Sequence, residues 1–265
     1  MMEPILFEQF EQHAEITLNR PEVLNALNQE MLNALKPIIQ TLSQCQKTKC
    51  VVVKANGKHF MAGGDVKMFA TLTMPGHVRK ETLKPSMHDL HECMEKLAQL
   101  PMPIIASVQG AVAGFGLGLM MASDIVIASD RAYFNMAYIK IGLCPDGLVT
   151  YWLPRKIGLS QAMAVALTGK RIGAIEAKEI GLINQVVLHD ELNSATETMV
   201  NTLNANSMLS MRHTKKLIRN SLDHDMLHQS KEELKAFGQC VANDHFVEGV
   251  KAFLEKRSPN FNNEP

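Results

Sequence analysis

The stretch from Pro101 to Ser123 limits the possible folds of this 265-residue chain most, because it contains no charged residue. An uncharged run of this length is long enough to cross a membrane as a helix. However, it includes Pro101, Pro103, Gln109 and four glycines, which disfavour a continuous helix facing lipid. The stretch therefore predicts a strand, a turn and a helix that are all buried inside a globular protein.

Strand signals dominate the first part of the chain and helix signals the last part. Strands are predicted at Ile5–Glu8, Ile16–Leu18, Cys50–Ala55, Ile104–Val108, Asp124–Ala128, Ala132–Asn135 and Ile183–Val187. An amphipathic helix is predicted from Asn28 to about Cys45. The stretch from Val66 to Leu100 is expected to form a short helix, a mobile loop around Pro85, and a second helix from about Ser86. This order predicts an α/β core over residues 1–195, followed by a helical C-terminal region over residues 196–265.

The composition excludes several classes of protein. Lys+Arg and Asp+Glu are equal at 27 each, so no excess of positive charge favours binding to nucleic acid or to an anionic membrane surface. The five cysteines are odd in number and lack CxxC spacing, which is typical of reduced thiols in a cytosolic protein. Residues Met1–Phe10 carry acids and no basic segment, so they do not resemble a secretion signal. We expect a soluble, cytoplasmic protein.

Two glycine-containing segments follow predicted strands. Phe60–Asp65 (FMAGGD) has two successive glycines, which let the backbone turn its amides outward, although a simple strand–helix turn capped by Asp65 explains it equally well. Gly110–Gly118 (GAVAGFGLG) precedes an apolar helix and lacks the spacing of a dinucleotide-binding motif. Its glycines allow either close helix packing or a helix N-terminus whose free N–H groups face negative charge.

The third segment of interest contains Asp146, between Pro145 and Gly147 and before a predicted helix at about Leu148. One interpretation is that Asp146 caps this helix. The other is that a rigid turn holds its carboxylate among apolar neighbours, where it could act as a catalytic base.

Six motifs resemble, in order and spacing, those of the crotonase (enoyl-CoA hydratase/isomerase) superfamily. They are Asn19–Leu27 (NRPEVLNAL), Phe60–Asp65 (FMAGGD), Val108–Gly116 (VQGAVAGFG), Ser123–Ala128 (SDIVIA), Leu153–Gly158 (LPRKIG) and Phe253–Phe261 (FLEKRSPNF). The resemblance implies a spiral ββα core with a C-terminal helical region that forms trimers, and a homotrimer or hexamer as the assembly. It also implies an acyl-CoA thioester as substrate, with no cofactor beyond the coenzyme A of that substrate.

The resemblance further implies roles for individual residues. The backbone amides of Ala62 and Phe115 are expected to form an oxyanion hole, which polarises the thioester carbonyl. Coenzyme A is expected to contact mainly backbone groups of two loops, with nearby Lys and Arg side chains meeting its phosphates. The residues expected to bind substrate are Val23, Leu24, Ala26, Gly63, Gly64, Asp65, Val66, Gly114 and Tyr138.

This chain departs from the hydratases of the family, which use two glutamates. The corresponding positions here are Gly118 and Tyr138, so Asp146 is the remaining acid, as in the isomerases that the chain resembles most. Adding water requires one group to activate it and another to protonate carbon, whereas one carboxylate suffices to shift a double bond. We therefore expect an isomerase that moves a β,γ double bond to the α,β position. The alternatives are a hydratase with atypical acids, or a CoA-binding protein of this fold without turnover.

No metal site is expected. His88 and His91 have helical spacing and Cys93 is nearby, but no third ligand is placed by the sequence. A solvated helix face explains them better.

Overall fold

The computed structural model describes residues 3–65 and 69–261. Its strands are β1 (Ile5–Gln9), β2 (His13–Leu18), β3 (Cys50–Ala55), β4 (Ile104–Val108), β5 (Ala111–Ala113), β6 (Ile125–Ser129), β7 (Tyr133–Asn135), β8 (Arg171–Gly173) and β9 (Gln185–Val187). Its α-helices are α1 (Gln29–Gln44), α3 (Gly76–Ala98), α4 (Phe115–Ala122), α5 (Val149–Ile157), α6 (Leu159–Thr168), α7 (Ala174–Glu179), α8 (Leu192–Asn204), α9 (Met208–Asn220), α10 (Met226–Val241) and α11 (Asp244–Leu254). Short 3₁₀ helices are η1 (Pro21–Val23), η2 (Ala137–Ile141) and η3 (His189–Glu191).

The main sheet has six strands in the order β1-β2-β3-β4-β6-β9. Only the β1–β2 pair in this sheet is antiparallel, and the other neighbours run parallel. A smaller sheet has the order β5-β7-β8. The parallel arrangement follows from the helices and long connections between successive strands. It brings the C-terminal ends of β3 and β4 to the same edge, from which the two glycine-containing segments continue.

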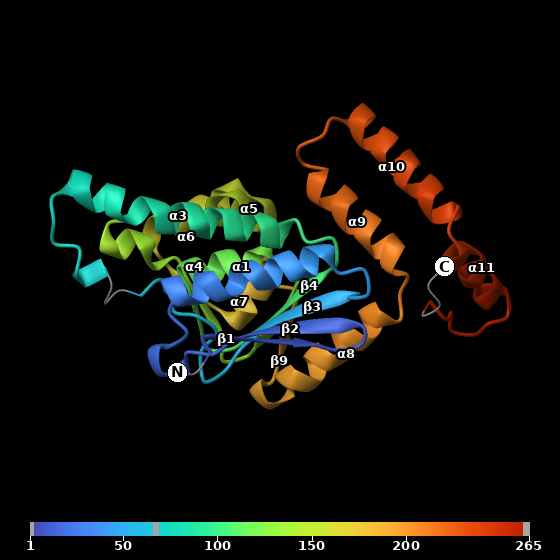
Figure 1. The fold of residues 1–265 in the computed structure, drawn as a ribbon, viewed down its shortest axis with the longest axis horizontal. Coiled ribbons are helices and arrows are strands. Elements are labelled where there is room, and N and C mark those ends of the chain that lie inside the picture. Colours follow the sequence, from blue (N-terminus) through green and yellow to red (C-terminus); the bar gives the residue numbers. More distant parts are fainter. Residues whose placement is uncertain (1–2, 66–68, 262–265) are drawn as a thin grey trace.

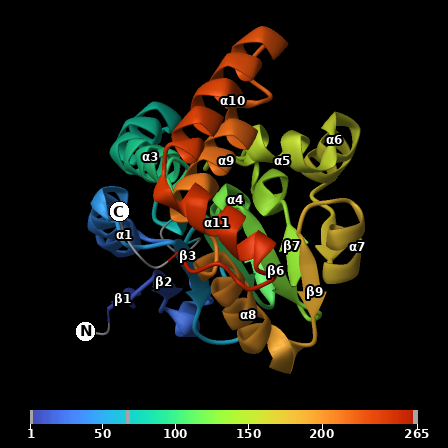
Figure 2. The same cartoon turned by 90° about the vertical axis from the view of Figure 1, so that its right-hand side faces the viewer.

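The central strands of the six-stranded sheet are covered on both faces, as Figures 1 and 2 show. On one face, Cys50 and Val52 of β3 pack with Leu192 and Val200 of α8. On the other face, alternate strand residues join the large core with α1, α3 and α4. Burial on both sides explains why β3 is a continuous apolar run.

The uncharged stretch is buried as predicted. Residues 102–122, which include β4, β5 and α4, are all buried. Within the described residues, no helix combines the length and apolar character that a membrane span requires.

Helix α3 differs from the prediction of a loop followed by a helix from about Ser86. It begins at Gly76 and runs through Pro85 to Ala98. Proline normally ends or kinks a helix because it removes a hydrogen bond to residue i−4. Here Pro85 is exposed, and so is Glu81, whose carbonyl loses that partner. Water can replace the lost bond, which makes the proline tolerable at this position.

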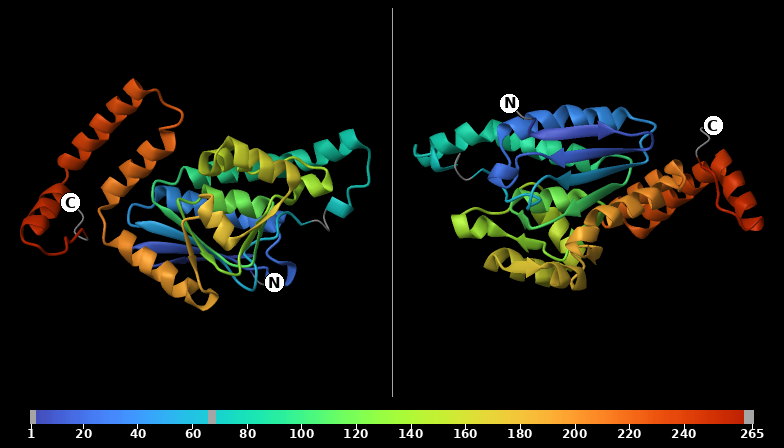
Figure 3. Two further views of the ribbon diagram at one scale, coloured as in Figure 1. Left: turned by 180° about the vertical axis from the view of Figure 1, so that it is seen from behind. Right: turned by 90° about the horizontal axis from the view of Figure 1, so that it is seen from below.

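The last three helices, α9 to α11, extend away from the α/β core, which Figure 3 shows most clearly in its right-hand view. This agrees with the prediction of a helical C-terminal region. The boundary predicted between residues 195 and 196 falls inside α8, which packs on the sheet. The projecting part begins after α8, with α9 at Met208.

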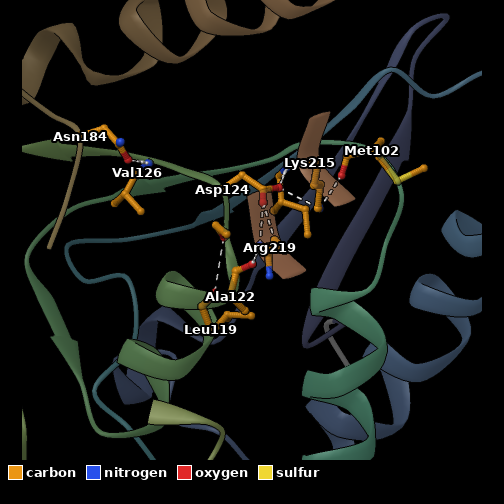
Figure 4. Close-up of polar contacts among 10 residues, drawn as sticks. Met102, Leu119, Ala122, Asp124, Val126, Asn184, Lys215 and Arg219 are labelled. Atoms are coloured by element: carbon orange, nitrogen blue, oxygen red, sulfur yellow. Dashed lines mark hydrogen bonds and ion pairs between the residues drawn. The ribbon is translucent and has the colours of Figure 1, made fainter. Parts of the chain in front are cut away.

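Asp124, which lies in the connection between α4 and β6, binds two side chains of helix α9 (Figure 4). Its Oδ2 accepts from the Ile104 amide at 2.8 Å and pairs with Lys215 Nζ at 2.8 Å. Its Oδ1 accepts from Arg219 Nε at 2.9 Å and Nη2 at 2.6 Å. Burial lowers the pKa of Lys215 to about 8, although the neighbouring Asp124 acts in the opposite direction. The cluster of Asp124, Lys215 and Arg219 is called the Asp124 anchor below.

Candidate active site

The segment 61–65 is the centre of the candidate site, because it lies between the loop 20–27 and β5. On one side, the Ala62 amide donates to the Leu24 carbonyl at 3.0 Å, and the Leu27 amide donates to the Gly63 carbonyl at 2.8 Å. On the other side, the Met61 amide donates to the Ala111 carbonyl at 3.0 Å. Three motifs that are far apart in the sequence therefore lie side by side.

Asn25 supports the first of these loops from within. Its side chain is fully buried, and its Oδ1 accepts from the Arg20 amide at 2.7 Å. Its Nδ2 donates to the carbonyls of Asn56 at 3.0 Å and His59 at 2.8 Å. The asparagine of the first motif is thus structural, and it holds the loop so that Leu24 is exposed.

The two glycine motifs approach each other at Gly63 and Gly114. Both residues have positive φ, +108° and +51°, and a Cβ placed on Gly114 would lie 3.3 Å from the Gly63 Cα. Side chains at these two positions would strain the backbone and separate the segments. The residues that follow these two glycines are Gly64 and Phe115.

The Ala62 amide, the first donor predicted for the oxyanion hole, is not free in this structure. That N–H group is already bonded to the Leu24 carbonyl, as described above. Across residues 3–65 and 69–261, the N–H groups of Gly64 and Phe115 have no hydrogen-bond acceptor. Phe115 is also the first residue of α4, where the helix dipole favours negative charge. Gly64 is thus an alternative candidate for the first donor, and Phe115 remains the candidate for the second.

Asp146 lies in the loop between η2 and α5 and is half-buried. The hydroxyl of Tyr138, in η2, donates to Asp146 Oδ1 at 2.7 Å. Burial raises the pKa of Tyr138 well above its usual value, and the Asp146 carboxylate raises it further, so the phenol stays protonated as a donor. The cap residue of α5 is Leu148, with no side-chain cap hydrogen bond. The interpretation of Asp146 as a helix cap is therefore wrong.

The Tyr138–Asp146 pair borders the Gly114–Phe115 turn. A Cβ on Gly114 would lie 3.9 Å from the Tyr138 Cζ. A Cβ on Gly147, next to Asp146, would lie 2.8 Å from Phe115 Cδ2. The Tyr138 ring and Gly147, the neighbour of Asp146, therefore both lie against the Gly114–Phe115 turn.

Gly118 faces the loop that carries Asp146. A Cβ at this position would meet the Gly147 carbonyl oxygen at 2.5 Å and the Val149 Cγ2 at 3.4 Å. The Gly147 oxygen belongs to the backbone and cannot turn away as a side chain can. Even a methyl group at position 118 therefore requires the loop to move. No acid can stand at position 118 in this arrangement of the loop.

Gly118→Ala is accordingly expected to lower the free energy of unfolding by about 1–3 kcal/mol, the usual cost of overpacking. The thermal midpoint should fall with it. Gly238→Ala is the matched control, because Gly238 is also helical, in α10, and a Cβ there meets nothing within 4 Å. The control should be stabilised by roughly 1 kcal/mol through helix propensity. Thermal unfolding of both variants measures this, and an unchanged Gly118→Ala variant would contradict the described loop position.

A family model described as "Enoyl-CoA hydratase/isomerase" matches residues 9–264 of the chain. The chain belongs to the enoyl-CoA hydratase/isomerase family. This confirms the resemblance to the crotonase superfamily, whose members act on acyl-CoA thioesters. It also identifies the chain as a member of an enzyme family.

Similar proteins carry both hydratase and isomerase names. The chain is 34% identical over 259 residues to a protein of Rhodobacter capsulatus named "Probable enoyl-CoA hydratase", covering 97% of each chain. It is 31% identical over 252 residues to the trans-2-decenoyl-acyl-carrier-protein isomerase of Streptococcus mutans, covering 94% of each chain. The crystal structure of an enoyl-CoA hydratase from Bacillus anthracis superposes with a TM-score of 0.91 at 30% identity, covering 98% of this chain and 100% of that one. The predicted crotonase-like α/β fold is therefore confirmed.

The remaining predicted residues of this enzyme are placed as follows. Val23 and Ala26 are half-buried beside exposed Leu24, and Asp65 lies 3.8 Å from Arg20 as an ion pair. Val66 lies outside the described residues. In the described part of the chain, no group of three or more His, Cys, Asp or Glu residues could hold a metal ion.

Proposed function

We propose that this enzyme is an enoyl-CoA isomerase that shifts a β,γ double bond to the α,β position. The observation that carries the proposal is the Asp146 carboxylate, which accepts from the Tyr138 hydroxyl in a loop that packs against Phe115. The position at which the resemblance places the first hydratase glutamate, Gly118, is closed by the Gly147 carbonyl. The second such position holds Tyr138, a group that stays protonated.

The mechanism needs one acid–base group and two hydrogen-bond donors. The amides of Gly64 and Phe115 donate to the thioester oxygen, which makes the C2 protons more acidic. Asp146 removes one C2 proton, and the electron pair of that C–H bond delocalises into a dienolate. The neutral acid then returns the proton to C4, while the double bond forms between C2 and C3. Asp146 ends the cycle as a carboxylate, so no other proton donor is required.

Two alternatives follow from the same residues. A hydratase would need a second group to deliver or relay a proton, and the position of the second hydratase glutamate holds Tyr138 here. The hydratase name of the Rhodobacter capsulatus relative keeps this function as the second candidate. A CoA-binding protein without turnover is the third candidate, and the retained Asp146 disfavours it.

We assign substrate binding to the loop 20–27 and the segment 61–65, which backbone hydrogen bonds join. Backbone groups of Val23, Leu24 and Ala26, together with Gly63, Gly64 and Asp65, form the edge on which coenzyme A would lie. Val66 and Gly114 complete this set by resemblance. Coenzyme A is part of the substrate, and the reaction drawn above uses no further cofactor.

One assay distinguishes the candidates. Purified protein is incubated separately with 3-enoyl-CoA and with 2-enoyl-CoA, and the conjugated product and the 3-hydroxyacyl-CoA are followed. An isomerase converts the first substrate to 2-enoyl-CoA and makes little 3-hydroxyacyl-CoA. Rapid hydration of 2-enoyl-CoA would favour the hydratase, and absence of both products would favour the binding protein.

We also propose that the chain assembles as a homotrimer or hexamer through its projecting helices. Phe253 and Leu254 of α11 are 83% and 75% exposed, and Leu234 and Phe237 of α10 are 74% and 69% exposed. Apolar side chains exposed together in this way are typical of interfaces. Phe261 instead packs within its own chain, 5.1 Å from the His245 ring. Sedimentation equilibrium at micromolar concentration is expected to give three or six times the mass of one chain, and a monomer would contradict the proposal.

A further inference from the structure

The hydroxyl of Tyr138 and the carboxylate of Asp146 form a hydrogen bond that the isomerase mechanism above does not use. Tyr138 Oη lies 2.7 Å from Asp146 Oδ1. Among the described side chains, no other donor bonds to this carboxylate. Asp146 therefore has one oxygen fixed by protein and the other, Oδ2, available to a ligand.

The two partners differ in how firmly the fold holds them. Tyr138 is 7% exposed and lies against Gly114, and its carbonyl accepts from the Leu143 amide at 3.0 Å. Residues 141–144, which lead to Asp146, are all exposed. The carboxylate thus lies at the end of an exposed loop, whereas the tyrosine side chain is buried.

We propose that Tyr138 is a positioning residue for the reaction, which fixes the rotation of the Asp146 carboxylate so that Oδ2 faces the acyl chain. This inference rests on the proposed role of Asp146 as the proton shuttle. A carboxylate oxygen that carries a proton from C2 to C4 must reach two carbons that are separated by C3. Free rotation of the side chain would place that oxygen correctly for only part of the time.

Tyr138 is suited to this role because it donates and does not titrate in the working range. Its pKa is raised above the usual value, first by burial and then by the Asp146 carboxylate. The phenol therefore cannot act as a base and cannot compete for the substrate proton. Its hydrogen bond to an ionised acceptor belongs to the stronger class of hydrogen bonds.

The test compares two tyrosine-to-phenylalanine variants. Tyr138→Phe keeps the ring and removes only the oxygen that holds Asp146. Tyr151→Phe is the matched control, because the Tyr151 hydroxyl also donates to a carboxylate, Asp223 Oδ2, at 2.9 Å, on the exposed side of α5. Both variants are assayed for conversion of 3-enoyl-CoA to 2-enoyl-CoA, with circular dichroism to compare their folds.

We expect kcat of Tyr138→Phe to fall by roughly 10- to 100-fold, the scale of loss produced by misplacing a catalytic group by about 1 Å. KM should change less than about twofold, because the amides and the CoA-binding loops are untouched, and Tyr151→Phe should match wild type. A purely structural tyrosine would not give a loss confined to kcat. The inference is overturned if Tyr138→Phe keeps kcat within about twofold of wild type, or if its loss lies in KM alone.

The failure of this inference differs from the failure of the proposed function. If Asp146→Asn loses turnover while Tyr138→Phe does not, only the positioning role is wrong. If Asp146→Asn keeps wild-type turnover, the shuttle itself is wrong, and the role of Tyr138 falls with it.

Discussion

Asp146→Asn is expected to lower kcat for isomerisation by roughly 10²- to 10⁴-fold, the contribution typical of a general acid–base group. The amide has nearly the same shape as the carboxylate and still accepts the hydrogen bond from Tyr138, but it cannot take a proton from C2. KM and the thermal midpoint should change little, because the amides of Gly64 and Phe115 still bind the thioester oxygen. A loss in kcat at constant KM is the pattern of an interaction needed only in the transition state. Steady-state kinetics on 3-enoyl-CoA, with thermal unfolding alongside, measure both quantities.

Asp223→Asn provides the matched control for this experiment. Asp223 also accepts from a tyrosine hydroxyl, that of Tyr151, but it is half exposed and pairs with Arg155 at 2.9 Å. The control should keep wild-type kinetics. If Asp146→Asn did so as well, Asp146 would not be the group that moves the proton.

Much of the site was predictable because its residue types follow from backbone geometry. Gly63 and Gly114 stand where two chain segments meet and where φ is positive, and glycine is the residue that tolerates both conditions. The sequence predicted that both segments follow strands, and the structure shows that these strands, β3 and β4, are parallel neighbours. The flanking Pro145 and Gly147 predicted that Asp146 lies on a turn, and the structure places it in the loop between η2 and α5.

What the sequence could not show is the hydrogen-bond register between distant segments. Adjacent amides in an extended segment point in opposite directions, so a shift of one residue changes which N–H group is free. Ala62 is bonded to Leu24 and Gly64 is not bonded, and this depends on how residues 61–65 align with the loop 20–27. The bond between Tyr138 and Asp146 also depends on the path of the loop between η2 and α5, which has no periodic pattern.

Asp124→Ala is expected to destabilise the fold by about 3–5 kcal/mol, the cost of leaving buried charges without their partner. The Lys215 side chain is only 8% exposed and the Arg219 side chain 17%, so neither can recover full hydration without moving. The Ile104 amide at the start of β4 loses its acceptor in the same variant. For a chain of this size the thermal midpoint should fall by about 10 °C. Denaturant titration of the free energy of unfolding checks the value.

The location of this loss can be tested separately, because the chain has a single tryptophan and it lies beside the Asp124 anchor. The Arg219 guanidinium carbon lies 4.7 Å from the centroid of the Trp152 ring. If the anchor holds α9 to the core, Asp124→Ala should change the native-state fluorescence of Trp152, because Arg219 is released from its carboxylate. Glu92→Ala is the control, since it removes an exposed carboxylate paired with Lys96 on α3 and should alter neither stability nor fluorescence measurably. Equal stability of the two variants would show that hydration replaces the carboxylate at no cost. The attachment of α9 would then depend on its apolar contacts rather than on Asp124.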